Sequence, residues 1–184
     1  MNVSLKDLIE TGSFGPVRLG MSRIQVERSL GAPDHVGGTS RKYRKPSILK
    51  YGDIEFHFAA STECLFLIHL DEFDVPTGGR SINLDPWIIR RALLLVEAEK
   101  HLLESGIGYK VEEYELEDFA KQITAGVGVK LVFSGENLNL QALSYHMPQS
   151  TNAWSGLALS GPLFSLCGRA AQARCYSAGL EGCR

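Results

Sequence analysis

The stretch that decides the fold runs from Ile54 to Leu70 and reads IEFHFAASTECLFLIHL. Its first part alternates the apolar residues Ile54, Phe56 and Phe58 with polar ones, and a second alternating run ends at Leu70. A period of two places successive side chains on opposite faces of a β-strand. Two such runs, joined by a few residues, predict an antiparallel hairpin with one buried face and one exposed face.

Further strands are predicted on both sides of this hairpin. SILKYG (47–52) precedes it, and three later segments have strand character: YKVEEYEL (109–116), VGVKLVF (127–133) and LNLQALSY (138–145). We interpret the acidic stretch 117–126 as a connector. Short connections between strands are typical of meanders. The predicted class is therefore α+β, with antiparallel β-meanders and helices packed on one face.

Three segments carry helix signals. Ser4 begins a short amphipathic helix that ends at Gly12, and Ser22, with Gln25 three residues later, begins a second that ends at Leu30. Asp85 and Pro86 are typical of a helix start and Gly106 of a helix end, which together predict a long helix over 85–105. We expect this helix to be buried along one stripe, formed by Trp87, Leu94, Leu95, Ala98, Leu102 and Leu103.

The order of these segments suggests a tandem duplication. Ile54–Leu70 and Val129–Leu143 share a hydrophobic pattern, which aligns Leu65, Leu67 and Leu70 with Leu138, Leu140 and Leu143. The predicted organisation is a first helix-plus-meander unit (1–74), a linker (75–84), a second unit (85–146) and an atypical tail (147–184). The tail has few charges and no sustained periodicity, so we expect it to lie outside the core.

Composition narrows the function classes. A net charge of −2 gives no excess of basic residues for a phosphate backbone, so no nucleic-acid partner is predicted, and the basic run SRKYRK (40–45) is interpreted as a solvated loop. No apolar window reaches the ~18 residues of a membrane helix, and no signal peptide is visible, so we expect a cytoplasmic protein without a membrane partner. No motif predicts a cofactor, and the cysteine spacing does not match a zinc site.

Acid and base side chains cluster in one region. Glu55, His57 and His69 fall on neighbouring predicted strands, and an imidazole beside a carboxylate is the minimal equipment of a small metal- or His-dependent hydrolase. The alternative is that they form the polar face of a half-exposed sheet. No nucleophile motif or phosphate loop accompanies them, so protein binding is the preferred interpretation. The predicted partner-binding residues are Tyr43, Tyr51, Glu55, His57, His69, Tyr109 and Tyr114.

The segment VRLGMSRIQVERSLGAPD (17–34), followed by the predicted meander, resembles the opening of the outer-membrane assembly lipoprotein family BamE (SmpA/OmlA). It also resembles the helix-plus-meander units of the tandem β-lactamase inhibitor proteins. The resemblance implies a protein-binding module with helices packed on one face of a meander. Because no lipoprotein signal is visible, the expected role is that of a cytoplasmic immunity or inhibitor protein that masks a toxin or an enzyme.

Overall fold

The computed structural model describes residues 1–38, 47–71, 73–114 and 120–148. Tyr43 and nearly all of the predicted tail lie outside the described residues. The described part contains three helices and twelve strands. In chain order these are β1 (Asn2–Ser4), α1 (Leu5–Thr11), β2 (Ser13–Phe14), β3 (Val17–Arg18), α2 (Arg23–Leu30), β4 (His35–Gly37), β5 (Ile48–Tyr51), β6 (Ile54–Phe58), β7 (Leu65–Leu70), β8 (Asn83–Asp85), α3 (Leu95–Glu104), β9 (Tyr109–Glu113), β10 (Lys121–Ala125), β11 (Val129–Ser134) and β12 (Asn139–His146).

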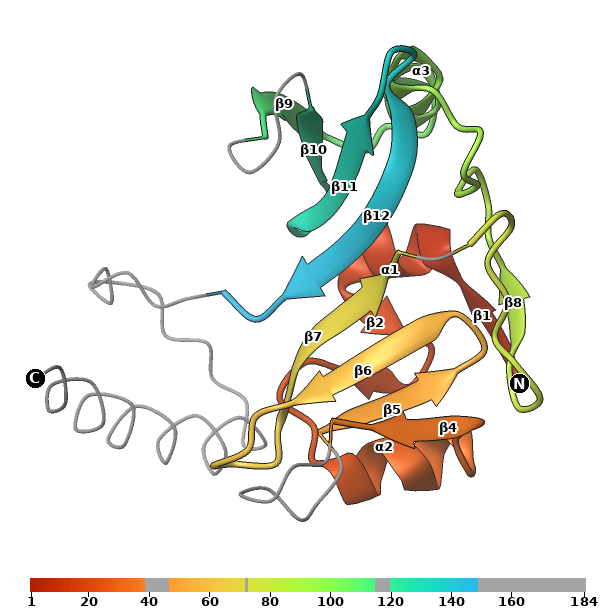
Figure 1. Cartoon of the computed structure of the whole chain (residues 1–184), viewed down its shortest axis with the longest axis vertical. Coiled ribbons are helices and arrows are strands. Elements are labelled where there is room, and N and C mark those ends of the chain that lie inside the picture. Colours follow the sequence, from red (N-terminus) through yellow and green to blue (C-terminus); the bar gives the residue numbers. More distant parts are fainter. Residues whose placement is uncertain (39–46, 72, 115–119, 149–184) are drawn as a thin grey trace, which may run out of the picture.

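Eight strands form one antiparallel sheet, in the order β4-β5-β6-β7-β12-β11-β10-β9 (Figure 1). Each half of the sheet is a meander whose strands follow chain order. The halves meet where the last strand of the second meander, β12, pairs with the last strand of the first, β7. Leu143 lies opposite Leu70 and Ser144 opposite His69 at this junction. The predicted α+β fold with antiparallel meanders is confirmed, and the two meanders form one continuous sheet.

The core combines one face of the sheet with buried residues of all three helices. In β6 the predicted alternation holds: Ile54, Phe56 and Phe58 are buried, whereas Glu55 and His57 are partly exposed. In the view of Figure 1, α1 lies behind β7 and β12. The helices contribute to the same hydrophobic cluster Leu5, Leu8 and Ile9 from α1, Val26 and Leu30 from α2, and Leu95, Ala98 and Leu102 from α3.

The long helix predicted over 85–105 is wrong in its first half, because α3 begins only at Leu95. Asp85 belongs to β8, which pairs in parallel with β1. The Asp85 carboxylate accepts a hydrogen bond from the Trp87 N–H (2.9 Å), and Trp87 has a φ of +53°, so the chain turns here instead of entering a helix. Within α3 the predicted stripe is also corrected, since Leu103 is 73% exposed.

One strand was missed because its apolar signal is weak. The predicted connector 117–126 contains β10, in which Ile123 and Ala125 are fully buried. Alanine is a poor strand former, and one isoleucine among polar residues shows no clear alternation. The strand is held on both sides, opposite β9 and opposite β11. Tertiary pairing therefore outweighs the low intrinsic propensity of this segment.

The predicted linker 75–84 is fastened to the first half of the molecule. Arg80 Nε donates to Asp34 Oδ1 at 2.7 Å, and the Thr77 N–H and hydroxyl both donate to Asp53 Oδ2. At its end, β8 lies against β1, with Leu84 opposite Val3. These contacts give the linker a defined path along the first unit.

The two meanders share an irregularity at equivalent places. The last two strands of each half are paired through a β-bulge, in which one residue of the final strand has no opposite partner. The extra residue is Phe66 in β7 and Gln141 in β12. The flanking pairs are Phe58–Leu65 and His57–Leu67 in the first half, and Phe133–Leu140 and Val132–Ala142 in the second.

The helices α2 and α3 enter their meanders in the same way. The residue that precedes each helix forms an isolated antiparallel bridge to the residue just before the first buried leucine of the bulged strand. Ser22 is bridged to Cys64, and Leu94 is bridged to Asn139. The next residue of each bulged strand adds a hydrogen bond. The Leu65 N–H donates to the Met21 carbonyl oxygen (2.8 Å), and the Leu140 N–H donates to the Leu93 carbonyl oxygen (2.9 Å). In both turns the residue before the bridge has a positive φ, +55° at Glu63 and +50° at Leu138.

These matches correct the predicted alignment of the two meanders, while their origin by duplication stays a prediction. The pairs Ile54–Val129, Phe56–Leu131 and Phe58–Phe133 occupy equivalent places, as predicted. In the last strand, Leu65 takes the place of Leu140 and not of Leu138, because Phe58 and Phe133 pair with these two leucines across turns of equal length. The predicted alignment was therefore shifted by two positions in this strand.

Among the helices of the described residues, none has the length and apolar character that a membrane span requires.

Candidate functional site

The exposed face of the central strands carries three histidines. His57 lies on β6, His69 on β7 and His146 at the end of β12. Strand pairing places His69 between Glu55 and Ser144, and places Leu67 between His57 and His146. All of these side chains point away from the core because they alternate with buried neighbours. We call the exposed face of β6, β7 and β12 the histidine face.

The bulge in β7 adds an aromatic side chain to this surface. Counted back from the buried Ile68 and Leu70, strict alternation would also bury Phe66. The extra residue breaks this alternation, so Phe66 and Leu67 both lie outside the core. Phe66 is 39% exposed, and its ring centroid lies 6.4 Å from that of His57 in an edge-to-face arrangement. The rings of His57 and His69 are 6.1 Å apart, also nearly perpendicular. Three rings therefore form one exposed cluster.

Glu55 organises the charges at one end of the cluster. Its Oε2 lies 2.9 Å from His57 Nε2, which donates the hydrogen bond when that nitrogen carries its proton. Its Oε1 accepts a hydrogen bond from Lys50 Nζ at 3.2 Å. Both carboxylate oxygens are engaged, so the His57 ring is held in one orientation. His69 Nε2 lies 3.4 Å from Asp71 Oδ2, which is a longer and more exposed contact.

Beside the other end of the histidine face lies Lys130 on β11, opposite Ser144 of β12, which makes this end basic. The pKa of His146 lies below its ordinary value, first because partial burial disfavours the imidazolium, and then because Lys130 and the other two histidines repel a further positive charge. Among the described residues, no carboxylate forms an ion pair with Lys130. A negative group placed between Lys130 and His146 would thus be favourable on this surface.

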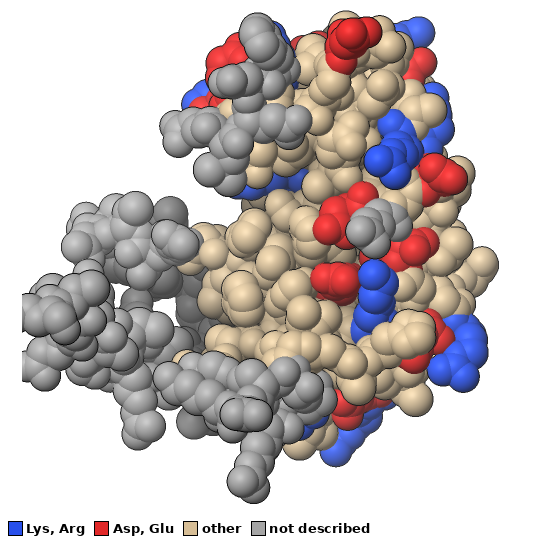
Figure 2. All heavy atoms as spheres, in the orientation of Figure 1, with Lys and Arg blue, Asp and Glu red and all other residues tan. Residues whose placement is uncertain are grey.

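Figure 2 shows the distribution of charge on the side of the molecule seen in Figure 1. Acidic and basic side chains lie in the middle and on the right of the described surface in this view, while the area to the left of them carries few. The uncharged side chains exposed on the same face of the sheet include Leu67, Val132, Ala142 and Ser144, each partly buried. A sheet surface that is poor in charge and carries aromatic rings has the composition of an interface centre.

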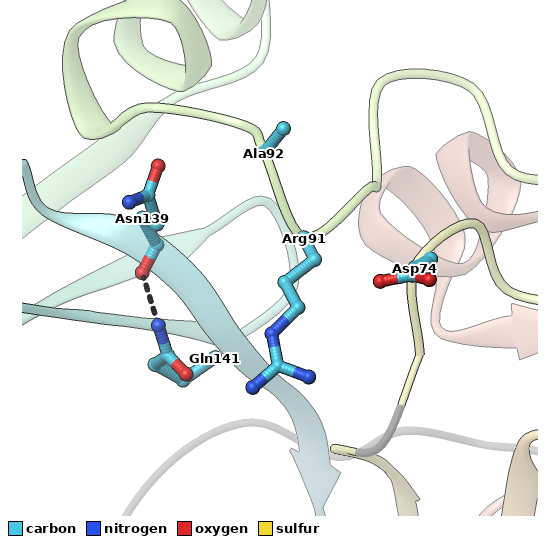
Figure 3. Close-up of a pocket in the computed structure, with 5 residues that line it drawn as sticks. All are labelled: Asp74, Arg91, Ala92, Asn139 and Gln141. Atoms are coloured by element: carbon cyan, nitrogen blue, oxygen red, sulfur yellow. Dashed lines mark hydrogen bonds between the residues drawn. The ribbon is translucent and has the colours of Figure 1, made fainter.

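A hollow of about 350 Å³ lies beside the bulge of the second half (Figure 3). The Arg91 side chain extends along β12, with Asn139 and Gln141 on one side of it and Asp74 on the other. The backbone N–H of Arg91 donates to the backbone carbonyl oxygen of Asp74 at 2.9 Å. The side-chain Nε2 of Gln141 donates to the backbone carbonyl oxygen of Asn139 at 3.2 Å. The hollow is shallow and open, and all of its lining residues except Ala92 are polar or charged, unlike the enclosed apolar interior of a typical small-molecule site.

A second hollow of about 420 Å³ lies near β4, between the linker and the β5–β6 turn. Its centre is the Asp34 carboxylate, which accepts hydrogen bonds from Arg80 and from the Gly52 N–H. The Arg80 guanidinium is the largest cause that lowers the pKa of Asp34. These contacts fasten the linker to the turn. Neither hollow is lined by His57, His69 or His146.

The structure brings together three of the predicted partner-binding residues and corrects a fourth. Glu55, His57 and His69 share the histidine face, as expected from neighbouring strands. The prediction that Tyr51 is a surface residue is wrong, because Tyr51 lies on the same face of β5 as Leu49 and is fully buried. Its hydroxyl donates to the Gly31 carbonyl oxygen at 2.8 Å, and burial, with smaller contributions from two nearby carboxylates, raises the pKa of Tyr51 to about 12.

The remaining predicted tyrosines lie away from the histidine face. Tyr109 begins the edge strand β9 and packs partly against the core. Tyr114 follows the end of β9, and its N–H donates to the Ala120 carbonyl oxygen at 2.9 Å. Both side chains are half-buried. Tyr43 lies outside the described residues, so its predicted role stays a prediction.

Sequence reasoning did not select Phe66 and His146, which complete the histidine face, or Lys130, which lies beside it on β11. From the sequence, Phe66 could be either an interface anchor or a core residue, because its strand is apolar on both faces, and no pattern in the sequence marks the bulge. His146 and Lys130 come from the second half, and only the pairing of β12 with β7 brings them beside His57. In the part of the chain that the structure describes, no group of three or more His, Cys, Asp or Glu side chains is placed to hold a metal ion.

Comparison with known proteins adds no relative. No family model, no curated protein and no solved structure matches the chain. The resemblance to the BamE family and to the β-lactamase inhibitor proteins therefore stays a prediction from short turn and helix motifs.

Proposed function

We propose that this chain is a protein-binding module and that it binds its partner with the histidine face. The observation that carries the proposal is the partly exposed ring cluster of Phe66, His57 and His69, with charged side chains beside it. Aromatic side chains that are rigid and half-exposed are typical anchors of interfaces. The cluster lies on paired strands, so little conformational entropy is lost when a partner orders it.

The charges on this face favour a particular kind of partner surface. Glu55 is already in an ion pair with Lys50 and in hydrogen-bond contact with His57, whereas Lys130 has no carboxylate partner among the described residues. An acidic side chain of the partner beside Lys130 and His146 would supply the missing negative charge. We therefore expect the partner to combine an apolar contact for Phe66 with a carboxylate for Lys130.

An immunity or inhibitor role, in which the chain masks a toxin or an enzyme, is part of this proposal. It is supported by the resemblance stated above, and the expected cytoplasmic location comes from the sequence alone. Masking requires only a complementary surface and no chemistry. The exposed and shallow arrangement of the histidine face suits such a role.

A small His-dependent hydrolase is the second candidate, and the 2.9 Å contact between Glu55 and His57 favours it. A carboxylate that orients an imidazole is a common arrangement for a general base. Against this candidate, neither hollow described above is lined by His57. A hydrolase of this kind would also need a nucleophile or an activated water held against the ring.

The test is capture of the partner followed by quantitative binding. Full-length protein immobilised on a resin is exposed to lysate of the source cell, and a retained protein is identified, purified and titrated by calorimetry. Phe66→Ala and His57→Ala should each raise the dissociation constant roughly 30-fold, the equivalent of about 2 kcal/mol for an interface anchor. Both variants should keep the wild-type melting temperature, because these side chains lie outside the core.

Matched controls come from α3, which lies outside the histidine face. Leu103→Ala removes an apolar side chain that is 73% exposed, and His101→Ala removes an exposed histidine. Both should bind the partner like the wild type. Equal binding by Phe66→Ala, His57→Ala and the controls would show that the histidine face is not the interface. Hydrolysis of an ester or peptide substrate that disappears in His57→Ala would instead support the enzyme candidate.

A further inference from the structure

The sheet has two edges of unequal quality for pairing with another strand. Strand β4 is short, with three residues, and Gly37 is its last. Strand β9 has five residues, Tyr109–Glu113, and pairs only with β10 among the strands that the structure describes. An edge strand of this length presents a row of backbone N–H and C=O groups to its open side. In Figure 1, β9 lies at the far end of the second meander.

The hydrogen bonds to β10 show which backbone groups of β9 face outwards. Just beyond the two ends of β9, the Tyr114 N–H donates to the Ala120 carbonyl, and the Gly108 carbonyl accepts from the Gly126 N–H, both at 2.9 Å. In an antiparallel ladder the residues with inward backbone groups alternate with those that face out. Since 108 and 114 face β10, so do 110 and 112. The outward groups belong to Tyr109, Val111 and Glu113.

The sequence of β9 is complementary to itself in one antiparallel register. When Val111 is placed opposite Val111 of a second copy, Lys110 falls opposite Glu112, and Tyr109 falls opposite Glu113. The three residues with outward backbone groups then pair with one another, as hydrogen-bonded pairs require. Lys110 and Glu112 form the alternating pairs, in which side chains approach most closely. The backbone and the charges therefore favour the same register.

We propose that β9 is a strand-pairing surface for a second copy of this chain, joined antiparallel about Val111. The two sheets would continue into one, related by a two-fold axis through this residue. Two Lys110–Glu112 pairs cross the contact on the exposed face, where Lys110 Nζ and Glu112 Oε1 already lie 2.6 Å apart within the chain. Val111, on the buried face, extends the core side across the junction. The inference is independent of the histidine face.

Charge complementarity selects a second copy over an unrelated strand. A partner strand must place a negative group opposite Lys110 and a positive group opposite Glu112, and another β9 does both at once. Displacement of the register by two residues would bring Lys110 opposite Lys110 or Glu112 opposite Glu112. Like charges directly opposite each other destabilise strand pairs. The exposed Lys and Glu side chains therefore reject other registers while they permit this one.

The test measures the association state of the full-length chain by sedimentation velocity over a wide concentration range. We expect a reversible dimer, weakened at least about tenfold in Lys110→Glu, in which both charge pairs become repulsive. The double variant Lys110→Glu/Glu112→Lys restores both pairs with reversed polarity, so it should dimerise within about threefold of the wild type. Val111→Pro removes the outward N–H at the centre, without removing a hydrogen bond to β10, and should also weaken the dimer at least about tenfold.

Lys100→Glu is the matched control, because Lys100 belongs to an exposed ion pair with Glu104 on α3 and lies outside β9. It should dimerise like the wild type. A wild-type chain that stays monomeric at every concentration would overturn the proposal. So would a dimer that Lys110→Glu does not weaken, or a double variant no stronger than the single one. The charge variants keep the test decisive even if Val111→Pro lowers the melting temperature.

Discussion

The two halves of the sheet share a backbone framework but differ in the side chains that they expose. Each half has a helix that bridges to the turn before its last strand, a residue of positive φ in that turn and a bulge in the same place. On the exposed face the equivalent positions hold different chemistry. Glu55, His57, Phe66 and His69 in the first half correspond to Lys130, Val132, Gln141 and Ser144 in the second.

This difference separates what the fold requires from what it leaves open. The buried positions are apolar in both halves, because packing against the helices demands it. The exposed positions carry no such demand, so a ring cluster in one half and a hollow beside Arg91 in the other are compatible with one framework. Function is therefore expected where the halves differ, and stability where they agree.

The largest effect should come from equivalent core positions. Phe56 is fully buried and packs edge-to-face against Phe14 and Tyr51, with centroids 5.4 and 5.6 Å away. Phe56→Ala should lower the free energy of unfolding by ~3–5 kcal/mol, and Leu131→Ala, at the equivalent place, by ~2–5 kcal/mol. Urea denaturation measures both losses. Leu103→Ala, on the exposed side of α3, should change the same free energy by less than ~0.5 kcal/mol.

Denaturation of these variants also tests whether the halves unfold together. Because β7 and β12 join them into one sheet, each variant should show a single cooperative transition with both halves lost at once. A second transition that appears only in Leu131→Ala would mean that the halves are independent. The comparison would then describe two domains and not two parts of one sheet.

A smaller effect is expected at Tyr51, which has no counterpart in the second half, where Ala125 stands at the equivalent hairpin end. Tyr51→Phe removes the hydrogen bond to the Gly31 carbonyl and should cost ~1–2 kcal/mol. Because the folded-state pKa of Tyr51 is raised to about 12, its contribution is present below pH 10 and lost as the pH rises towards 12. Absorbance titration at alkaline pH measures this pKa, and a tyrosinate signal from Tyr51 near pH 10 would contradict its burial.

The smallest effect concerns His146, where the two halves meet. Its folded-state pKa is lowered, so the unfolded chain binds the proton more readily and stability falls as the pH drops through the range below 6.5. Lys130→Gln removes one repelling charge and should raise the pKa of His146, measured by NMR titration of the imidazole signals. Lys100→Gln, on α3, is the control and should leave it unchanged. An unchanged value in both variants would show that Lys130 does not act on His146.

Local patterns predicted the elements whose signals lie within a few residues. Ser22 with Gln25 forms a capping box in the structure, since Ser22 Oγ accepts from the Gln25 N–H and Gln25 Oε1 from the Ser22 N–H. The alternation of β6 correctly separated its buried and exposed side chains. In both cases the interactions that decide the structure are local, so the sequence alone contains the signal.

The errors share the opposite cause. Asp85 and Pro86 have the composition of a helix start, but the pairing of β8 with β1, far away in the chain, determines their conformation. Strand β10 depends on neighbours on both sides, and the histidine face depends on the junction of β7 with β12. Pairing between segments that are far apart in the chain produces no periodic pattern in the sequence of either segment. The exposed site could thus be predicted only for the three residues that lie on one hairpin.

The junction of β7 with β12 also bears on how the chain folds as it is synthesised. The first meander can form from residues before Asp71, but β7 then remains an open edge until residues 139–146 have emerged. Open edges invite pairing between nascent chains on neighbouring ribosomes. The bulge at Phe66 twists the strand locally, and the polar His69 interrupts its apolar run. A bulge and a polar side chain both make an open edge a poorer template for pairing, so the irregularity that exposes a ring on the finished surface is also favourable while β7 is unpaired.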